Sequence, residues 1–162
     1  MGCGVPYAIG AKFAHSDRPA YALVGDGAMQ MKGINELITI AKYWQEWQDT
    51  RLVVCVLHND DLNQVTWELR AMGGSPQFLP SQQLPDFSYA AYAKSLDLHG
   101  LEVSDPGDVA GAWEEAMAAR RPCVIDFHTD PAVPPIPPHA VGPVDQGGRI
   151  HCAGRQRSAE YD

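Results

Sequence analysis

The amino-acid sequence predicts an α/β fold, in which a parallel sheet carries helices on both of its faces. Short apolar runs alternate along the chain with segments whose apolar residues recur at helical spacing. The clearest strand candidate, residues 51–59 (RLVVCVLHN), is apolar at successive positions, so both of its faces are expected to be buried. Strands of this kind belong to parallel sheets, in which right-handed crossover helices cover the sheet.

The first half of the chain is expected to alternate between helices and strands. Residues 4–14 place small apolar residues at helical spacing, with Pro6 near the helix start. Residues 20–26 form a compact apolar run that is typical of a buried strand, and residues 51–59 form the next strand. Between these strands, the apolar residues expected on one face of a helix are Ile34, Leu37, Ile38, Ala41 and Trp44.

The second half continues the alternation. The expected helices are residues 62–72 (stopped by Gly73-Gly74), 85–100 and 105–120, the expected strands are residues 101–104 and 122–130, and residues 75–85 are an expected loop. Asp86 is the expected N-cap of the middle helix, with Gly100 at its end. Asp105 or Asp108 is the expected cap of the last helix.

Length and charge narrow the classes of function. With 162 residues the chain is long enough for one domain with a buried core, which we assign to residues 1–137. Residues 138–162 are an expected irregular tail, because they have no apolar period. A net charge of −8 argues against nucleic acid or an anionic membrane as partner. The sequence contains no run of about 18 apolar residues, so no membrane span is predicted.

The cysteines are expected to be structural thiols, because none of them forms a CxxC pair and Cys55 and Cys123 lie inside apolar runs. Free thiols are typical of a reducing compartment, so we expect the protein to be cytoplasmic. Most histidines show no shared spacing and are expected to be surface or packing residues: His15, His99, His128, His139 and His151.

A carboxylate stands between two glycines at the end of the first strand, in the sequence Gly25-Asp26-Gly27. In open α/β sheets ligands bind at the carboxyl ends of the strands, and the N–H groups of a following helix attract phosphate. Asp26 would repel a phosphate there unless a cation lay between them, so the turn is typical of a metal–phosphate site. The alternative is that Asp26 is a simple N-cap of the next helix.

Asn59 occupies the same position after the next strand. If the two strands are neighbours, Asp26 and Asn59 face one crevice. A carboxylate oxygen, an amide oxygen and a main-chain carbonyl form a set of ligands that suits Mg²⁺. The alternative for Asn59 is a turn residue that caps the following helix. The paired spacing favours the magnesium site.

Together these motifs resemble the diphosphate-binding motif of thiamine diphosphate enzymes. The segments MGCGVPYAIGAK, before the first strand, and NDDLNQVTWE, after the second, resemble the corresponding parts of pyruvate oxidases and acetolactate synthases. The resemblance covers residues 1–137. It implies that they correspond to the C-terminal diphosphate-binding domain of these enzymes and have the thiamine diphosphate-binding fold. It also implies thiamine diphosphate and Mg²⁺ as cofactors, and a 2-oxoacid such as pyruvate as substrate of the complete enzyme.

The resemblance further implies roles for individual residues. Asp26, Asn59 and the main-chain carbonyl of Asp61 would bind Mg²⁺. Met1 matches the apolar residue that supports the bent cofactor in these enzymes. The residues implied near the cofactor are Met1, Gly25, Asp26, Gly27, Ala28, Met29, Asn59, Asp61, Leu62 and Asn63. His58 departs from the family pattern, because it stands where the first asparagine of a pair is usual, and we interpret it as a packing residue at the strand end.

No catalytic residue is assigned within this chain. In the enzymes that it resembles, the glutamate that acts on the aminopyrimidine lies in another domain. Glu36, on the helix after Asp26, is out of reach of that end of the cofactor. We therefore expect a fragment of a larger enzyme that forms homo-oligomers, and we do not expect the isolated chain to be catalytic.

A truncated, non-catalytic module that binds or assembles by self-association is the alternative. Its contact surface would include large apolar side chains that a lone domain leaves partly exposed: Trp44, Trp47, Trp67, Met29 and Met31. Ordinary packing in the core is an equally good explanation for these residues. A dinucleotide-binding domain is a weaker alternative, because no GxGxxG follows the first strand.

Overall fold

The computed structural model describes residues 1–133, apart from the side chains of residues 71–73. The predicted tail at residues 138–162 lies outside the described residues. No helix in the described part of the chain is long and apolar enough to cross a membrane.

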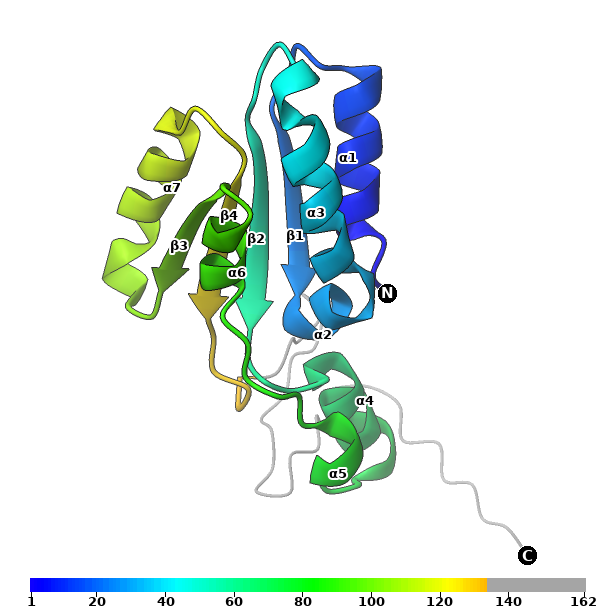
Figure 1. Cartoon of the computed structure of the whole chain (residues 1–162). Helices are drawn as coiled ribbons and strands as arrows, with labels where there is room; N and C mark the ends of the chain where they lie inside the picture. Colours follow the sequence, from blue (N-terminus) through cyan, green and yellow to red (C-terminus); the bar gives the residue numbers. More distant parts are fainter. Residues whose placement is uncertain (134–162) are drawn as a thin grey trace, which may run out of the picture. The chain divides into compact units, whose positions relative to one another are not determined.

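The chain divides into two units, of which the larger contains residues 1–60 and 84–130 and the smaller contains residues 61–83 and the chain from residue 131. The larger unit is built on a four-stranded parallel sheet with the order β1-β2-β4-β3 (Figure 1). Its strands are β1 (Ala20–Gly25), β2 (Leu52–His58), β3 (His99–Val103) and β4 (Cys123–His128). The parallel pairing confirms the predicted fold class.

Helices cover both faces of this sheet, as predicted. The helices on one face are α1 (Gly4–Ala14), α3 (Ile34–Tyr43) and α6 (Tyr89–Ser95), whereas α7 (Val109–Ala118) packs on the other. The steps from β1 to β2 and from β2 to β3 run in one direction across the sheet, and the step from β3 to β4 runs back. Because such crossovers are right-handed, the reversal places α7 on the opposite face.

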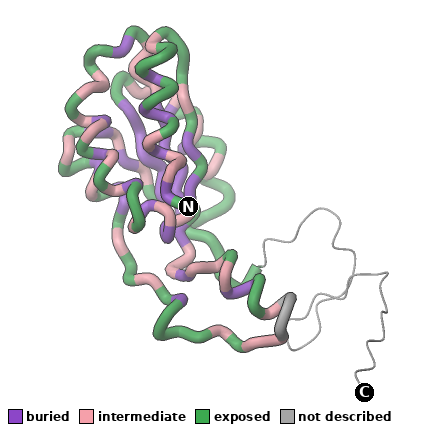
Figure 2. Tube along the Cα trace, turned by 90° about the vertical axis from the view of Figure 1, so that its right-hand side faces the viewer, coloured by how far each residue is buried: buried purple, intermediate pink, exposed green. Residues whose placement is uncertain are grey.

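Strand β2 lies at the centre of the core. Its residues from Leu52 to Val56 are all buried, which confirms that both faces of this strand are covered. Val54 and Val56 pack with residues of α1 and α3, and Val53 and Cys55 pack with residues of α7. Figure 2 shows the buried residues concentrated in the strands and on the inner sides of the helices of this unit.

The buried face of α3 is rotated from the predicted one. Leu37 and Ile40 are fully buried, whereas Ile38 is 54% exposed. Successive helical residues are turned by about 100°, so Ile40 lies closer than Ile38 to a face centred on Leu37. The prediction for Ile38 was wrong because the apolar residues of this helix cover more than one face.

The start of α6 also differs from the prediction. Its N-cap is Ser88, whose hydroxyl accepts a hydrogen bond from the N–H of Ala91 at 3.2 Å, and not Asp86. Gly100 lies in β3 and does not end the helix. Serine and aspartate are both good caps, so the sequence alone could not choose between two caps that are two residues apart.

A short 3-10 turn (Pro106–Asp108) precedes α7. Asp105 caps this turn, because its carboxylate accepts the N–H of Gly107 at 2.7 Å. Of the two predicted caps, Asp105 is therefore the one whose side chain makes the capping bond.

The smaller unit contains α4 (Asn63–Gly73) and α5 (Leu79–Gln82). Helix α4 ends as predicted, since Gly74 has a φ of 63°, the left-handed conformation that glycine favours. Helix α5 lies in the region where we expected only a loop, because its four residues are too few to show a periodic apolar pattern. The N–H of Leu62 donates to the carbonyl of Gln82 at 2.7 Å, which ties the two ends of this segment together.

The large apolar residues that we considered for a contact surface are mostly core. Met29, Trp47 and Trp67 are 0%, 5% and 8% exposed, so core packing is the alternative that holds for these three. Trp44 is partly buried, and Met31 is 50% exposed. Met29 fits into the core because Gly33 lies beside it, where a Cβ would approach the Met29 sulfur to 2.4 Å.

Candidate functional site

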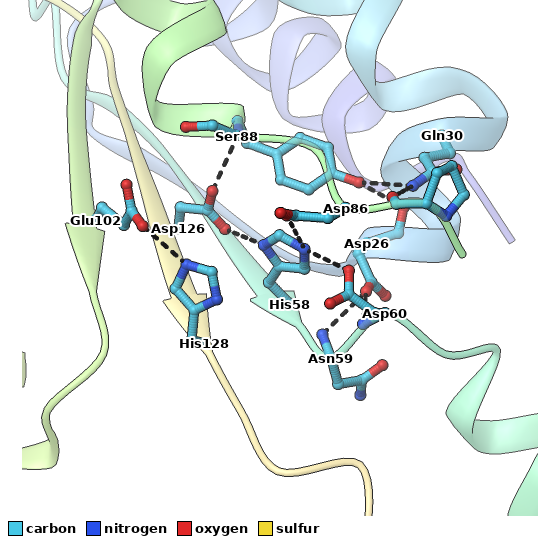
Figure 3. Close-up of polar contacts among 12 residues, drawn as sticks. Asp26, Gln30, His58, Asn59, Asp60, Asp86, Ser88, Glu102, Asp126 and His128 are labelled. Atoms are coloured by element: carbon cyan, nitrogen blue, oxygen red, sulfur yellow. Dashed lines mark hydrogen bonds and ion pairs between the residues drawn. The ribbon is translucent and has the colours of Figure 1, made fainter. Parts of the chain in front are cut away.

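The carboxylate of Asp26 joins the carboxyl ends of β1 and β2. Asp26 follows β1 directly and is 2% exposed. Its Oδ2 accepts the N–H groups of Asn59 at 2.9 Å and Asp60 at 2.7 Å, both of which follow β2 (Figure 3). Its Oδ1 accepts the N–H of Gly27 at 2.8 Å. The two strand ends that the sequence analysis placed in one crevice are thus directly bonded.

This arrangement differs from a simple N-cap. The short helix α2 (Asp26–Ala28) begins at Asp26 itself, and Gly25 occupies the N-cap position without a side-chain bond. The carboxylate is instead held by main-chain N–H groups from a second strand end. An ionised carboxylate has about four acceptor positions, and these three bonds leave one position on Oδ1.

The turn after β2 is shaped to present its N–H groups to Asp26. Asp60 has a φ of 55°, a left-handed conformation that is uncommon outside glycine. Successive N–H groups in such a turn can converge on one anion, and here they converge on the Asp26 carboxylate. In Figure 3 the main-chain N–H of Asn59 faces Asp26, while its side-chain amide extends to the other side of the main chain.

His58 lies at the centre of a second set of polar contacts. Its ring is almost fully buried, and its Nδ1 lies 3.0 Å from Asp126 Oδ1 on β4. Its Nε2 lies 2.9 Å from Asp60 Oδ1 and 3.7 Å from Asp86 Oδ1. The ring also stacks on His128, with centroids 4.7 Å apart. The interpretation of His58 as a packing residue therefore missed its polar contacts.

Tyr89 closes this cluster from α6. Its main-chain N–H donates to Asp126 Oδ2 at 3.0 Å, and its ring lies nearly perpendicular to the His58 ring, with centroids 5.3 Å apart. Its hydroxyl donates to the main-chain carbonyl of Asp26 at 3.3 Å and lies 3.3 Å from the amide of Gln30. Burial raises the pKa of Tyr89 to about 12, so the phenol stays neutral at physiological pH.

Burial and charge act in opposite directions on His58 and Asp126. Burial alone would lower the pKa of His58, but Asp60 and Asp126 outweigh it and raise the pKa above its ordinary value. Burial raises the pKa of Asp126, and the charge of His58 opposes this. Both ring nitrogens of His58 lie within hydrogen-bond distance of carboxylate oxygens, which are acceptors, so this geometry suits a ring that donates from both nitrogens.

Two groups in the described residues bring three metal-ligand atoms within 4.8 Å of one another. One group is Asp26, His58 and Asp60, and the other is His58, Asp126 and His128. The first contains Asp26 from the predicted magnesium set. The carboxylates suit hard divalent cations, whereas the imidazoles suit transition metals.

The predicted cofactor residues of the larger unit lie mainly at the β1–α2 junction. Gly25 ends β1, and Gly27 and Ala28 form α2 with Asp26. Met29 follows at the start of a π-helical turn (Met29–Gly33). Since its side chain is in the core, only its main chain is available to a ligand. Met1 is 75% exposed.

The remaining predicted residues, Asp61, Leu62 and Asn63, belong to the smaller unit. Asp61 is 5% exposed, and its carboxylate accepts hydrogen bonds from Thr66 Oγ1 at 3.0 Å and Gln77 Nε2 at 2.9 Å. Asn63 donates to the main-chain carbonyl of Pro131 at 2.8 Å. The Asp61 side chain is therefore committed within its own unit, and the prediction for Asp61 concerns only its carbonyl.

The sequence analysis missed Asp60, Tyr89 and Asp126 as members of the cluster. A usable signal existed for Asp126, because it is a charged residue inside the apolar strand CVIDFH. Asp60 and Tyr89 carried no such signal, since an aspartate in a turn and an aromatic residue in a helix are both common.

An apolar cavity of about 390 Å³ lies on the α7 side of the sheet. Leu23, Leu57, Trp113 and Phe127 contribute apolar walls to it. Asp26 and His58 do not line this cavity, but His128, which stacks on His58, does.

Comparison with known proteins identifies the family. The model described as "Thiamine pyrophosphate enzyme, C-terminal TPP binding domain" matches residues 1–127. The chain is 31% identical over 137 residues to YdaP of Bacillus subtilis, which is named as a thiamine pyrophosphate-containing protein, and the match covers 85% of this chain and 22% of YdaP. It is 30% identical over 132 residues to the acetolactate synthase large subunit of Haemophilus influenzae, with coverages of 80% and 22%.

A solved structure agrees with these relatives. The thiamine diphosphate-dependent 4-hydroxybenzoylformate decarboxylase of Rhodococcus jostii RHA1 matches with a TM-score of 0.68 and 26% identity, over 80% of this chain and 23% of that chain. The chain therefore spans less than a quarter of the length of these relatives. By its sequence and its fold, the chain belongs to the family of C-terminal, thiamine pyrophosphate-binding domains of thiamine pyrophosphate enzymes.

Proposed function

We propose that this domain binds thiamine diphosphate through Mg²⁺ as part of an enzyme that decarboxylates a 2-oxoacid, of the pyruvate oxidase or acetolactate synthase type. The proposed Mg²⁺ ligands are Asp26, the side-chain oxygen of Asn59 and the main-chain carbonyl of Asp61. The observation that carries the proposal is the buried Asp26 carboxylate, which is fixed at the ends of two neighbouring strands.

The chemistry of the donors fits a small divalent cation. Asp26 keeps one acceptor position on Oδ1 after its three N–H bonds. Mg²⁺ prefers oxygen ligands and is usually held by one or two carboxylates together with phosphate oxygens and water. Asn59 contributes an amide oxygen if its side chain rotates toward Asp26.

Thiamine diphosphate, when bound, supplies an electron sink for decarboxylation. The part proposed for this chain is to hold the diphosphate end. Gly25, Gly27, Ala28 and the main chain of Met29 would approach it at the start of α2, where the N-terminus of a helix favours an anion. Further contacts are proposed for Met1, Leu62 and Asn63.

We propose that the chain is not catalytic by itself and acts within a homo-oligomeric enzyme in the cytoplasm. The relatives are more than four times longer than the matched region, and in the enzymes that the chain resembles the catalytic glutamate lies in another domain. Apolar side chains that are exposed on α1 suit contacts with other subunits, because Tyr7 is 75% and Phe13 is 54% exposed. The same exposure favours the alternative of a non-catalytic module that self-associates.

Calorimetric titration of the full chain with thiamine diphosphate, with and without Mg²⁺, tests the proposal. We expect heat of binding only with the ion, and we expect Asp26→Ala to abolish it. Asp105→Ala is the matched control, because Asp105 is an exposed carboxylate that caps a turn. Binding that survives Asp26→Ala would overturn the assignment of Asp26. Binding that needs no ion would overturn the magnesium site, and absence of any cofactor binding would favour the non-catalytic module.

A further inference from the structure

His58 connects three separate parts of the larger unit. Its ring reaches Asp126 on β4 through Nδ1 at 3.0 Å and Asp60 in the following turn through Nε2 at 2.9 Å. Its carbonyl accepts the N–H of Thr129 at 2.7 Å. A residue that only filled space would not need both ring nitrogens within hydrogen-bond distance of carboxylates.

The turn that His58 contacts is strained and partly exposed. Asp60 has a φ of 55°, and its side chain is 46% exposed. A non-glycine residue seldom adopts this conformation, so surrounding contacts maintain it. Two contacts do so, because His58 holds the Asp60 carboxylate and Asp26 holds the Asp60 N–H at 2.7 Å.

The anchor of this arrangement is more deeply buried than the turn. Asp126 is fully buried within β4, and its second oxygen accepts the N–H of Tyr89 at 3.0 Å. The His58 ring is further enclosed by the Tyr89 ring, which lies nearly perpendicular to it, and by His128. The imidazole therefore links the buried Asp126 of β4 to the turn after β2.

We propose that His58 is a positioning residue, which holds the turn after β2 so that the N–H groups of Asn59 and Asp60 meet Asp26 and fix its carboxylate for the cation. The effect of His58 on cation binding rests on the proposed function. Its effect on the geometry of the turn does not. An asparagine side chain is shorter than an imidazole, so in His58→Asn we expect it not to bridge Asp126 and Asp60 as this ring does.

Amide hydrogen exchange in the cofactor-free chain tests the turn directly. In His58→Asn we expect the Asn59 and Asp60 amides to exchange at least about tenfold faster than in the wild type, because the turn opens more often. Val56→Ala is the matched control, since Val56 lies on the same strand and face and contributes only apolar packing. Exchange at these two amides should change less in this control, and equal acceleration in both variants would overturn the proposal.

A double-mutant cycle separates positioning from general destabilisation. If Asp126 acts through His58, the effects of Asp126→Asn and His58→Asn on Asp60 exchange should not add. Additive effects would overturn the proposed chain of contacts. If the variants do not fold, the imidazole N–H protons of the wild type give the answer by NMR. A signal protected from exchange and close to Asp60 is expected, and a freely exchanging ring would contradict the proposal.

The metal-related part is measured by titrating Mg²⁺ at saturating thiamine diphosphate. We expect about tenfold weaker Mg²⁺ binding in His58→Asn and a change of less than about twofold in Val56→Ala. Failure of the proposed function would appear as no magnesium-dependent heat in the wild type. Failure of this inference would appear as wild-type amide exchange in His58→Asn, so the two failures are distinguishable.

Discussion

The carboxylate of Asp26 and the main-chain N–H of Asp60, 2.7 Å apart, join two strand ends that are far apart in the sequence. β1 and β2 are parallel neighbours, so their carboxyl ends lie at the same edge of the sheet. The Asp26 carboxylate bonds directly to the main chain after β2, so this contact holds the two strand ends together. Asp26 thus has a structural role in the chain that does not depend on a bound cation.

Asp26→Asn should lower the free energy of unfolding by about 1–3 kcal/mol in the absence of cofactor. The asparagine amide keeps one acceptor oxygen. Its NH₂ group, however, would face main-chain N–H groups that donate hydrogen bonds to the carboxylate in the wild type. Urea unfolding measures the loss. Asp108→Asn is the control, because Asp108 is exposed and its side chain makes no capping bond. Equal stability of Asp26→Asn and wild type would show that these N–H groups find other partners.

The fold could be predicted from the sequence because its central strand carries an unambiguous pattern. Apolar residues at every position from Leu52 to Val56 require a strand that is covered on both faces, and this requirement leads to a parallel sheet with helices. The N-cap of α6 and the buried face of α3 were harder to predict. Ser88 and Asp86 are equivalent as caps, and Ile38 and Ile40 are equivalent as apolar residues, so tertiary packing decided between them.

The candidate site was only partly predictable for a similar reason. Asp26 was identifiable as a carboxylate between glycines at a strand end. The groups that bind it are main-chain N–H groups, which every residue except proline carries and which no sequence pattern reveals. The pairing of His58 with Asp126 depends on β2 and β4 being neighbours, across 68 residues of sequence, and strand order was not part of the prediction.

Lys12→Met should destabilise the chain by about 2–3 kcal/mol, although methionine fills a similar volume. Lys12 is fully buried, and its ammonium group donates to the main-chain carbonyls of Ser16, Arg18 and Asp49, the last at 2.7 Å. Methionine would leave these carbonyls without that donor.

Chemical unfolding measures this effect, and Lys42→Met is its control. Lys42 is exposed and lies over the ring of Tyr43, so its replacement should change stability by less than about 0.5 kcal/mol. A Lys12→Met variant as stable as the wild type would mean that water replaces the ammonium group.

Gly100→Ala and Gly111→Ala should have opposite effects on stability. A Cβ at Gly100 would come within 2.2 Å of the Ala90 carbonyl oxygen, so α6 would have to move away from β3, at a cost of about 1–3 kcal/mol. A Cβ at Gly111 in α7 would meet nothing within 4 Å. The better helix propensity of alanine should stabilise that variant by up to about 1 kcal/mol. Thermal unfolding of both variants checks the pair, and a stabilising Gly100→Ala would contradict the packing of α6 on β3.

The thiols of Cys55 and Cys123 should make the fold sensitive to alkaline pH. Burial raises the pKa of Cys55 from 9.0 to about 11 and that of Cys123 to about 12. Between these values and the ordinary one, the unfolded chain releases thiol protons that the folded chain retains. The free energy of unfolding therefore falls as pH rises above about 9, by up to about 1.4 kcal/mol per pH unit for each thiol.

Urea unfolding from pH 8 to pH 10.5 should show a shallower decline in Cys55→Ala than in the wild type. A slope that is the same in the wild type and in Cys55→Ala would show that this thiol ionises in the folded chain as readily as in the unfolded one.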